Sequence, residues 1–192
     1  MWDGAMLSRL MTYWVYGGFL ASFLILALMP LMAVPLPLLG VILQLPVYML
    51  HQLEEHDDDR FRRFVNTHIG GGRNVLPVAG VFVINIGGVW LLNLISIWLA
   101  ATVDLGFGLI GIYGMLVNGV VHIVAALVSR RYNPGLVTAI VLMLPAGLVG
   151  MWGVVASGHG GLAFQLTGLA AGIALHIAII GYVLTNKRRL VG

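Results

Sequence analysis

Six long apolar stretches follow one another along the chain, separated by short segments that contain prolines, glycines or polar residues. These stretches run over residues 11–30, 37–56, 75–101, 107–129, 135–156 and 162–185. A helix that crosses a bilayer needs roughly 20 mainly apolar residues, so each stretch is long enough to span a membrane. The pattern predicts an all-α fold: a polytopic integral membrane protein with a single transmembrane domain over residues 1–192, a bundle of about six helices.

The overall composition also indicates a membrane protein. Hydrophobic residues make up 60% of the chain, charged residues only 9%, and the mean hydropathy is +1.00. Soluble domains carry about 25% charged residues, so an ordinary soluble globule is excluded. The chain has no cysteine, which excludes disulfides, thiolate-bound metals, iron–sulfur clusters and cysteine nucleophiles.

The basic residues predict how the helices are oriented. With six spans and a cytoplasmic N-terminus, all 10 Lys and Arg residues fall on the cytoplasmic side, in agreement with the positive-inside rule. We therefore expect a protein of the inner (cell) membrane that is surrounded by membrane lipids and has both termini in the cytoplasm. The net charge of +3 reflects this orientation, and no nucleic-acid-binding module accompanies it, so nucleic acid is not an expected partner.

The second stretch ends in ionisable residues. The 13 residues from Leu38 to Leu50 form a helix only about 20 Å long, which is shorter than the roughly 30 Å hydrocarbon core. The helix must therefore continue through the HQLEEH segment at 51–56, which places these side chains in or just below the cytoplasmic interface. Pro46 is expected to kink this helix midway.

Helical spacing groups part of this segment on one face. At about 100° per residue, a narrow stripe contains Tyr48, His51 and Glu55. Glu54 lies on the flank of the stripe, and His56 points elsewhere. A histidine followed by carboxylates three and four residues later can hold a metal ion or form an acid–base pair. The alternative is a charged helix end that is solvated by water.

Three histidines on the even-numbered spans are expected at one depth. These spans run in the same direction, and His51, His122 and His176 precede the next basic residue by nine, eight and eleven positions. That spacing places the imidazoles about 12–16 Å from those basic residues. Asn118 lies one turn before His122, and Asn85 on the third span reaches a similar depth. Ionisable groups inside a membrane are costly, so this layer is a candidate site; helix–helix hydrogen bonding is the alternative.

The connection between the fourth and fifth spans is a further candidate element. Residues 129–135 read SRRYNPG, and Pro134 suits the first turn of the next helix. A helix N-terminus beside Arg130 and Arg131 can bind an anion at the cytoplasmic membrane surface. The alternative is that the arginines only anchor the helix on the cytoplasmic side.

Three motifs occur in order along the chain: His51-x-x-Glu54-Glu55, Asn118-x-x-x-His122 and Arg130-x-Tyr132-x-Pro134-Gly135. In this order they resemble the HXXEE family of small integral membrane proteins, over about half of the chain. The resemblance implies a multi-span helical protein with a suspected enzymatic site. The residues to which it points are His51, Glu54, Glu55, Asn118, His122, Arg130 and Tyr132. His176 lies outside these motifs and is included because of its depth alone.

The leading interpretation is a metal-dependent intramembrane enzyme. It would hydrolyse, or transfer a group on, a lipid-like or phosphorylated amphiphilic substrate at the cytoplasmic leaflet. The expected metal ligands are His51, Glu55, His122 and His176. Zinc suits a set of nitrogen and oxygen ligands best, and manganese or iron also fit. The expected catalytic residues are Glu54, Glu55, Asn118 and Tyr132, and the expected substrate-binding residues are Tyr48, Asn85, Arg130 and Arg131.

Other functions are compatible with the same residues. His51 and a buried glutamate can shuttle protons in a metal-free isomerase of a sterol-like or isoprenoid lipid. His122 and His176 can bind haem as axial ligands or line a quinone site. A transporter that relays protons through buried histidine and glutamate is a further alternative.

Overall fold

The computed structural model describes residues 4–191, and this part of the chain is helical, with short connections and no strand. The α-helices are α1 (Gly4–Leu28), α2 (Leu36–Ile42), α3 (Gln44–His56), α4 (Arg60–His68), α5 (Val78–Phe82), α6 (Leu91–Thr102), α7 (Leu109–Ser129), α8 (Leu136–Thr138), α9 (Leu144–Ala156) and α10 (Leu162–Val191). Shorter 3-10 segments are η1 (Met29–Leu31), η2 (Asp57–Asp59) and η4 (Leu105–Gly108). Two π-helical segments are η3 (Val83–Trp90) and η5 (Ala139–Met143).

Consecutive pieces join into 6 segments that are long and apolar enough to span a membrane: Gly4–Leu31, Leu36–His68, Val78–Thr102, Leu105–Ser129, Leu136–Ala156 and Leu162–Leu190. The predicted all-α membrane bundle is therefore confirmed, although some bounds differ. The second segment does not stop at residue 56 but continues as α4. The third begins at Val78 rather than at residue 75, because Pro77 disfavours a helical conformation of the residue before it.

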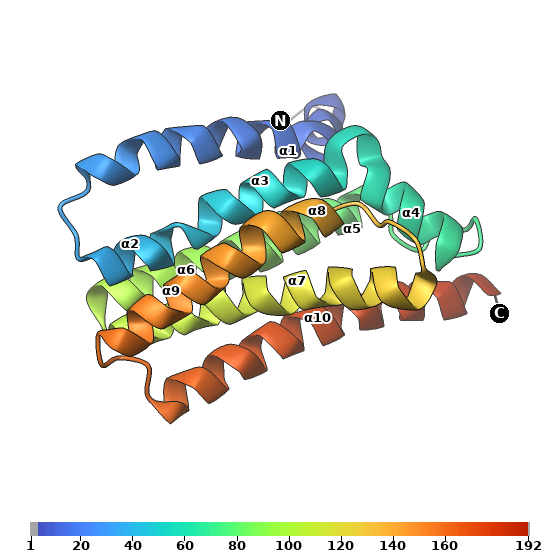
Figure 1. Cartoon of the computed structure of the whole chain (residues 1–192). Helices are drawn as coiled ribbons and strands as arrows, with labels where there is room; N and C mark the ends of the chain where they lie inside the picture. The colour runs from blue at the N-terminus through green and yellow to red at the C-terminus, as the bar shows by residue number, and fades with distance from the viewer. Residues whose placement is uncertain (1–3, 192) are drawn as a thin grey trace.

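Helices α1 and α10 lie on opposite sides of the bundle, with α3 and α7 between them (Figure 1). α1 packs mainly along α3, and α10 packs mainly along α7. Half of the most apolar part of the second span is buried, and 39% of that of the fourth, against 17–28% for the others. The second and fourth spans therefore form the interior, and both carry candidate site residues.

Helix α4, the connection after α7 and the end of α10 lie at the same end of the bundle (Figure 1). Most of the basic residues belong to these segments. We call it the inner end, because the positive-inside rule predicts that it faces the cytoplasm.

The second span breaks near its middle, at Leu43, where α2 gives way to α3. Pro46 has no N–H to donate to the carbonyl of Ile42, so the regular helical hydrogen bonding is interrupted there. The expected kink is thus present, three residues before the proline. Beyond it, α3 carries the HQLEEH segment into the interior at the inner end.

A sharp turn separates α3 from α4. Asp58 and Asp59 adopt left-handed backbone conformations, with φ of 51° and 58°, which aspartate tolerates better than most residues. Ion pairs across the turn join Asp57 to Arg60, Asp58 to Arg63 and Asp59 to Arg62. These contacts fix where α4 starts.

Helix α4 is amphipathic and covers the inner end of the bundle. Its Val65 is buried in an apolar cluster with Trp14, Val75, Leu76 and Val183, which come from α1, the α4–α5 connection and α10. The arginines of α4 form ion pairs with the aspartates on the other side. The helix thus closes the space between α3, α7 and α10 at the inner end.

Candidate metal centre

Three ligand-type side chains converge in the interior of the bundle. His51 and Glu55 lie one turn apart on α3, and His122 reaches them from α7. Glu55 Oε2 lies 3.4 Å from His51 Nε2, and Glu55 Oε1 lies 3.1 Å from His122 Nε2. One ligand atom of each residue lies within 4.8 Å of the others. The three residues are only 0%, 6% and 4% exposed, so the cluster lies away from the bulk solvent.

The ring of His51 is oriented by Thr138. His51 Nδ1 lies 2.9 Å from Thr138 Oγ1, and this hydroxyl donates its proton to a carboxylate oxygen of Glu54. Because that proton is used, Thr138 Oγ1 can only accept from His51, and the ring therefore carries its proton on Nδ1. The lone pair of the imidazole is then on Nε2, which faces Glu55. The Asn118 amide nitrogen, 3.2 Å away, donates toward the same Nε2.

The ring of His122 is oriented in the same way by Asn133. Asn133 Nδ2 donates to the backbone carbonyl of His122 at 3.0 Å, so the side-chain oxygen of Asn133 is the atom that faces the imidazole. That oxygen lies 2.6 Å from His122 Nδ1 and accepts its proton. The lone pair of this imidazole is therefore also on Nε2, toward Glu55.

Two imidazole lone pairs and one carboxylate thus face one another in a buried place. Such an arrangement is repulsive unless a cation or additional protons lie between the groups. The Nε2 atoms of His51 and His122 lie 3.4 and 3.1 Å from different oxygens of Glu55, and one ligand atom of each residue lies within 4.8 Å of the others, which is close enough for the three residues to share one ion. The tie from each Nδ1 to an outer polar group is the arrangement that metal-binding histidines use. These residues therefore fit a divalent ion with nitrogen and oxygen ligands.

Gly135 closes the cluster from one side. Its φ of +99° favours glycine, and a Cβ there would lie 2.7 Å from Glu55 Cγ, 2.7 Å from His122 Cε1 and 2.8 Å from His51 Cε1. Any side chain at this position would therefore displace all three ligand-type residues at once. The Asn-Pro-Gly turn packs directly on the site.

Glu54 does not face the cluster, although it is next to Glu55. Its carboxylate accepts hydrogen bonds from the backbone N–H of Val137 and of Thr138, at the start of α8, from the Thr138 hydroxyl and from the phenol of Tyr132. The helix N-terminus for which we expected an external anion is thus occupied by the carboxylate of the chain itself. Burial and the Glu54 carboxylate raise the pKa of Tyr132 to about 12, so this phenol remains a donor at neutral pH.

His176 and Asn118 lie beside the cluster rather than within it. His176 donates from Nδ1 to the carbonyl of Gly172 at 2.8 Å, and its Nε2 lies 3.3 Å from Asn118 Oδ1. The structure therefore does not bring His176 into the group of metal ligands as expected, but links it to His51 through Asn118. Counting residues along the helices placed His176 at the level of Asn118, which it contacts, but such counting does not fix how far its side chain lies from Glu55.

His56 was expected to point away from the site, and the structure corrects this. Its Nε2 lies 3.5 Å from Glu55 Oε2 and 3.2 Å from the amide nitrogen of Asn85. Asn85 in turn accepts a hydrogen bond from Gln52, and Gln52 accepts one from the indole N–H of Trp90. An indole N–H can only donate, so every hydrogen bond in this series is donated from Trp90 toward His56. The amide of Asn85 therefore donates to His56 Nε2, which carries the lone pair.

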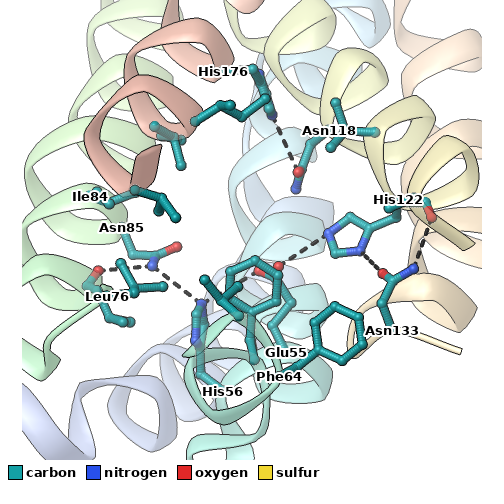
Figure 2. A pocket seen from close by; sticks show the side chains of 18 of the residues that line it. Glu55, His56, Phe64, Leu76, Ile84, Asn85, Asn118, His122, Asn133 and His176 are labelled. Carbon is teal, nitrogen blue, oxygen red and sulfur yellow. Dashed lines mark hydrogen bonds and ion pairs between the residues drawn. The ribbon is translucent and has the colours of Figure 1, made fainter. Parts of the chain in front are cut away.

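A cavity of about 340 Å³ adjoins the cluster, and Figure 2 shows the side chains around it. Polar groups gather in its wall: Glu55, His56, Asn85, Asn118, His122, Asn133 and His176. Tyr48 also lines the cavity, so two of the residues expected to bind substrate, Tyr48 and Asn85, border this space. The remaining wall is apolar and comes from α4, α5, η3, α7 and α10.

Arg130 and Arg131 are exposed at the end of α7, and neither lines the cavity. Arg130 has a left-handed backbone with a φ of 53°, which ends the helix and directs the chain away. The structure therefore does not bring these two expected substrate-binding residues to the site. They lie at the inner end, as positive-inside anchors do.

Sequence reasoning did not single out Asn133 and Thr138, which hold the ligand-type residues in place, and it named Gly135 only as part of a motif, without its contact with the cluster. The Asn-Pro-Gly sequence indicated a turn at 133–135, but its contact with α3 depends on long-range packing. Thr138 contacts His51 across 87 positions of the chain, a separation that helical spacing cannot predict.

Comparison with known proteins identifies the family of the chain. Residues 42–150 match a family model that is described as a protein of unknown function with HXXEE motif. No curated protein and no solved structure matches. The matched region contains His51, Glu55 and His122 together with Asn133 and Thr138, which hold them. Because it covers more than half of the 192 residues, the chain belongs to the HXXEE-motif family, as its motifs indicated.

Proposed function

We propose that this protein is a metal-dependent intramembrane enzyme that hydrolyses, or transfers a group on, a lipid-like substrate at the cytoplasmic leaflet of the cell membrane. The observation that carries the proposal is the convergence of His51 Nε2, His122 Nε2 and the Glu55 carboxylate, with both Nδ1 protons directed outward. Intramembrane ionisable groups are costly, and they are kept mainly where they act.

Zinc is the ion that two imidazoles and one carboxylate suit best, with manganese or iron as further options. Three protein ligands are typical of catalytic rather than structural zinc sites. When bound, zinc supplies a water with a pKa near 7, which is a nucleophile at neutral pH. Glu55 and His122 border the cavity, so this position is accessible to a molecule within it.

The polar residues around the cluster receive roles from their placement. His56 is positioned to accept a proton once Asn85 releases its hydrogen bond to Nε2, because this atom also lies 3.5 Å from Glu55 and His56 lines the cavity. Asn118 is positioned to donate a hydrogen bond to a substrate oxygen or to orient His51. Glu54 was expected to be the general base, but its four hydrogen bonds leave it the role of fixing Thr138, and through it His51.

Metal analysis of the detergent-purified protein tests the proposal. We expect about one divalent ion per chain in the wild type, and its loss in His51→Ala and in His122→Ala, since two ligands hold an ion far less tightly than three. His68→Ala is the matched control, because His68 is exposed on α4 and bonds only to the carbonyl of Phe64. Equal metal content in all four proteins would contradict the proposal.

A metal-free acid–base isomerase of a sterol-like or isoprenoid lipid is the second candidate. It is favoured by the separation of 3.1 Å between His122 Nε2 and Glu55 Oε1, which is also a hydrogen-bond distance. It requires that protons on Nε2 replace the metal, in addition to the protons already held on Nδ1. Activity in a protein free of stoichiometric metal would favour this candidate.

A further inference from the structure

The cavity has two chemically different parts. Near α3 and α7 its wall carries the carboxylate, imidazole and amide groups of the cluster. Elsewhere its wall is formed by aliphatic and aromatic side chains, among them Phe61, Phe64, Ile84 and Ile179. A pocket of this kind selects a ligand with one small polar group on a larger apolar body.

No lysine or arginine lines the cavity among the residues that the structure describes. Helix α4 contributes to the cavity wall and carries three arginines, but these form ion pairs with Asp57, Asp58 and Asp59 outside the cavity. Proteins hold phosphate groups with arginine, with lysine or with the free N–H groups of a helix N-terminus. The N-terminus beside the site, at α8, already binds Glu54.

The charges at the site also disfavour a phosphorylated ligand. Glu55 is the one acidic side chain that lines the cavity in the described part of the chain. A phosphate monoester carries a charge near −2 at neutral pH. Besides an ion at the cluster, which Glu55 already offsets in part, only histidines are present in the wall as basic side chains, so the phosphate would be buried without a lysine or arginine partner. An uncharged ester, amide or alcohol group does not have this cost, and the amide of Asn118 and the imidazole of His176 can bond to it.

The apolar part of the cavity adjoins the lipid-facing surface. A second, more open pocket of about 560 Å³ lies between α5, η3 and α10 and shares Ile84 and Ile179 with the cavity. Gly80, Gly87 and Gly88 line it, and of these Gly87 has no close neighbour from another helix, whereas Gly80 and Gly88 let α10 approach closely. The wall between the two spaces includes the π-helical segment η3, a kind of helix that is frequent at functional sites.

We infer that the substrate is an uncharged amphiphile: a neutral ester-, amide- or alcohol-type group at the His–Glu cluster, with a hydrocarbon chain along the apolar wall toward η3 and α10. That this ligand is a substrate rests on the proposed function, whereas its binding in the cavity does not. It narrows the lipid-like substrate by excluding phosphorylated head groups, which the sequence alone had left open.

Binding of two probes with the same chain tests this inference. Hexadecanol and hexadecyl phosphate are added to the detergent-purified, zinc-loaded full-length protein, and retention is measured by native mass spectrometry. We expect hexadecanol to bind one to one, and hexadecyl phosphate to bind at least about tenfold more weakly. Equal or tighter binding of the phosphate would overturn the inference, as would the absence of hexadecanol binding.

Tryptophan substitutions at two adjacent positions of α7 test where the hydrocarbon chain of hexadecanol binds. Val121→Trp places a large ring in the cavity wall, whereas Val120→Trp adds the same ring at a lipid-facing position of α7. We expect at least about tenfold weaker hexadecanol binding in Val121→Trp only. Equal binding by both variants would overturn the inference. The comparison of the two probes on the wild type stands even if Val121→Trp does not fold.

Metal content, measured on the same wild-type preparation, separates this inference from the proposed function. Hexadecanol binding by protein that takes up no zinc would contradict the metal-dependent reaction and support the ligand class. Zinc uptake together with preferred binding of hexadecyl phosphate would support the metal site and overturn the ligand class.

Discussion

Glu54 and Glu55 are adjacent in the sequence, yet they belong to two regions with different chemistry. Around Glu55 are two imidazole nitrogens and a cavity. Around Glu54 are the first backbone N–H groups of α8, a threonine hydroxyl and a tyrosine phenol. The carboxylate of Glu55 lacks hydrogen-bond donors, because the nitrogens that face it carry lone pairs. The carboxylate of Glu54 accepts four hydrogen bonds. Under the proposed function the two adjacent glutamates therefore have different roles: Glu55 would bind the ion, and Glu54 would position Thr138.

The largest effect is expected for Glu55→Gln. An amide is a poor metal ligand beside two imidazoles, and the change also removes the negative charge that offsets the ion. We expect zinc affinity to fall by more than about 100-fold, a greater loss than outer-shell changes cause. Competition with a chelator of known affinity measures it. An affinity within a few-fold of the wild type would show that Glu55 is not a ligand.

Gly135→Ala should disturb the Glu55 region almost as strongly. The added Cβ meets three ligand-type residues at less than 3 Å, and the backbone has a positive φ. Gly158→Ala is a matched control, since Gly158 has a φ of +86° and no neighbour within 4 Å of its Cβ position. We expect only the backbone cost of about 1–2 kcal/mol in the control and, in Gly135→Ala, loss of the metal as well. Full metal content in Gly135→Ala would contradict the packing described here.

Glu54→Gln is expected to have a smaller effect on the metal. The side chain does not contact the ion, but it holds the Thr138 hydroxyl that orients His51. Loss of such an outer contact lowers metal affinity by about 10–100-fold. We therefore expect Glu54→Gln to bind a full equivalent of zinc when zinc is in excess, with reduced affinity. If Glu54→Gln lost zinc as completely as Glu55→Gln, the division of work between the glutamates would be wrong.

The smallest effect is expected for Tyr132→Phe, which removes one hydrogen bond to Glu54 at an exposed position. Stability should fall by less than about 1 kcal/mol in thermal unfolding. The pKa of this tyrosine is raised in the folded protein to about 12. Its protonated phenol therefore stabilises the fold fully below pH 10, and the effect is lost as the pH rises toward 12. A difference between wild type and variant that changes between pH 6 and 9 would contradict this assignment.

Sequence reasoning predicted the helices well because a bilayer imposes a simple pattern of apolar length. It also placed His51 and Glu55 on one face of α3, since helical spacing fixes the relation between residues one turn apart. It named Glu55 as the ligand beside His122, but it could not find the partners of Glu54, because these depend on how α8 and the connection before it pack against α3. The same limit explains the wrong direction of His56, whose environment is set by Trp90 and Asn85 on another span.

The histidines show a similar contrast. Counting residues to the next basic residue predicted that His122 and His176 lie at the level of His51, and in the structure Asn118 contacts both His51 and His176 while His122 lies beside Glu55. Depth does not give distance within the layer: His122 contacts Glu55 directly, whereas His176 reaches His51 only through Asn118. Asn133 lies in a connection and Thr138 in the first turns of the fifth span, and the role of both became evident only from their hydrogen bonds.

X-ray absorption at the zinc edge tests the central claim most directly, because it reports the atoms around the ion. For the zinc-loaded wild type we predict two imidazole nitrogens and one or two oxygens at about 2.0–2.1 Å, and one imidazole fewer in His122→Ala. A spectrum without imidazole scattering, or one that is the same in His122→Ala, would contradict the account.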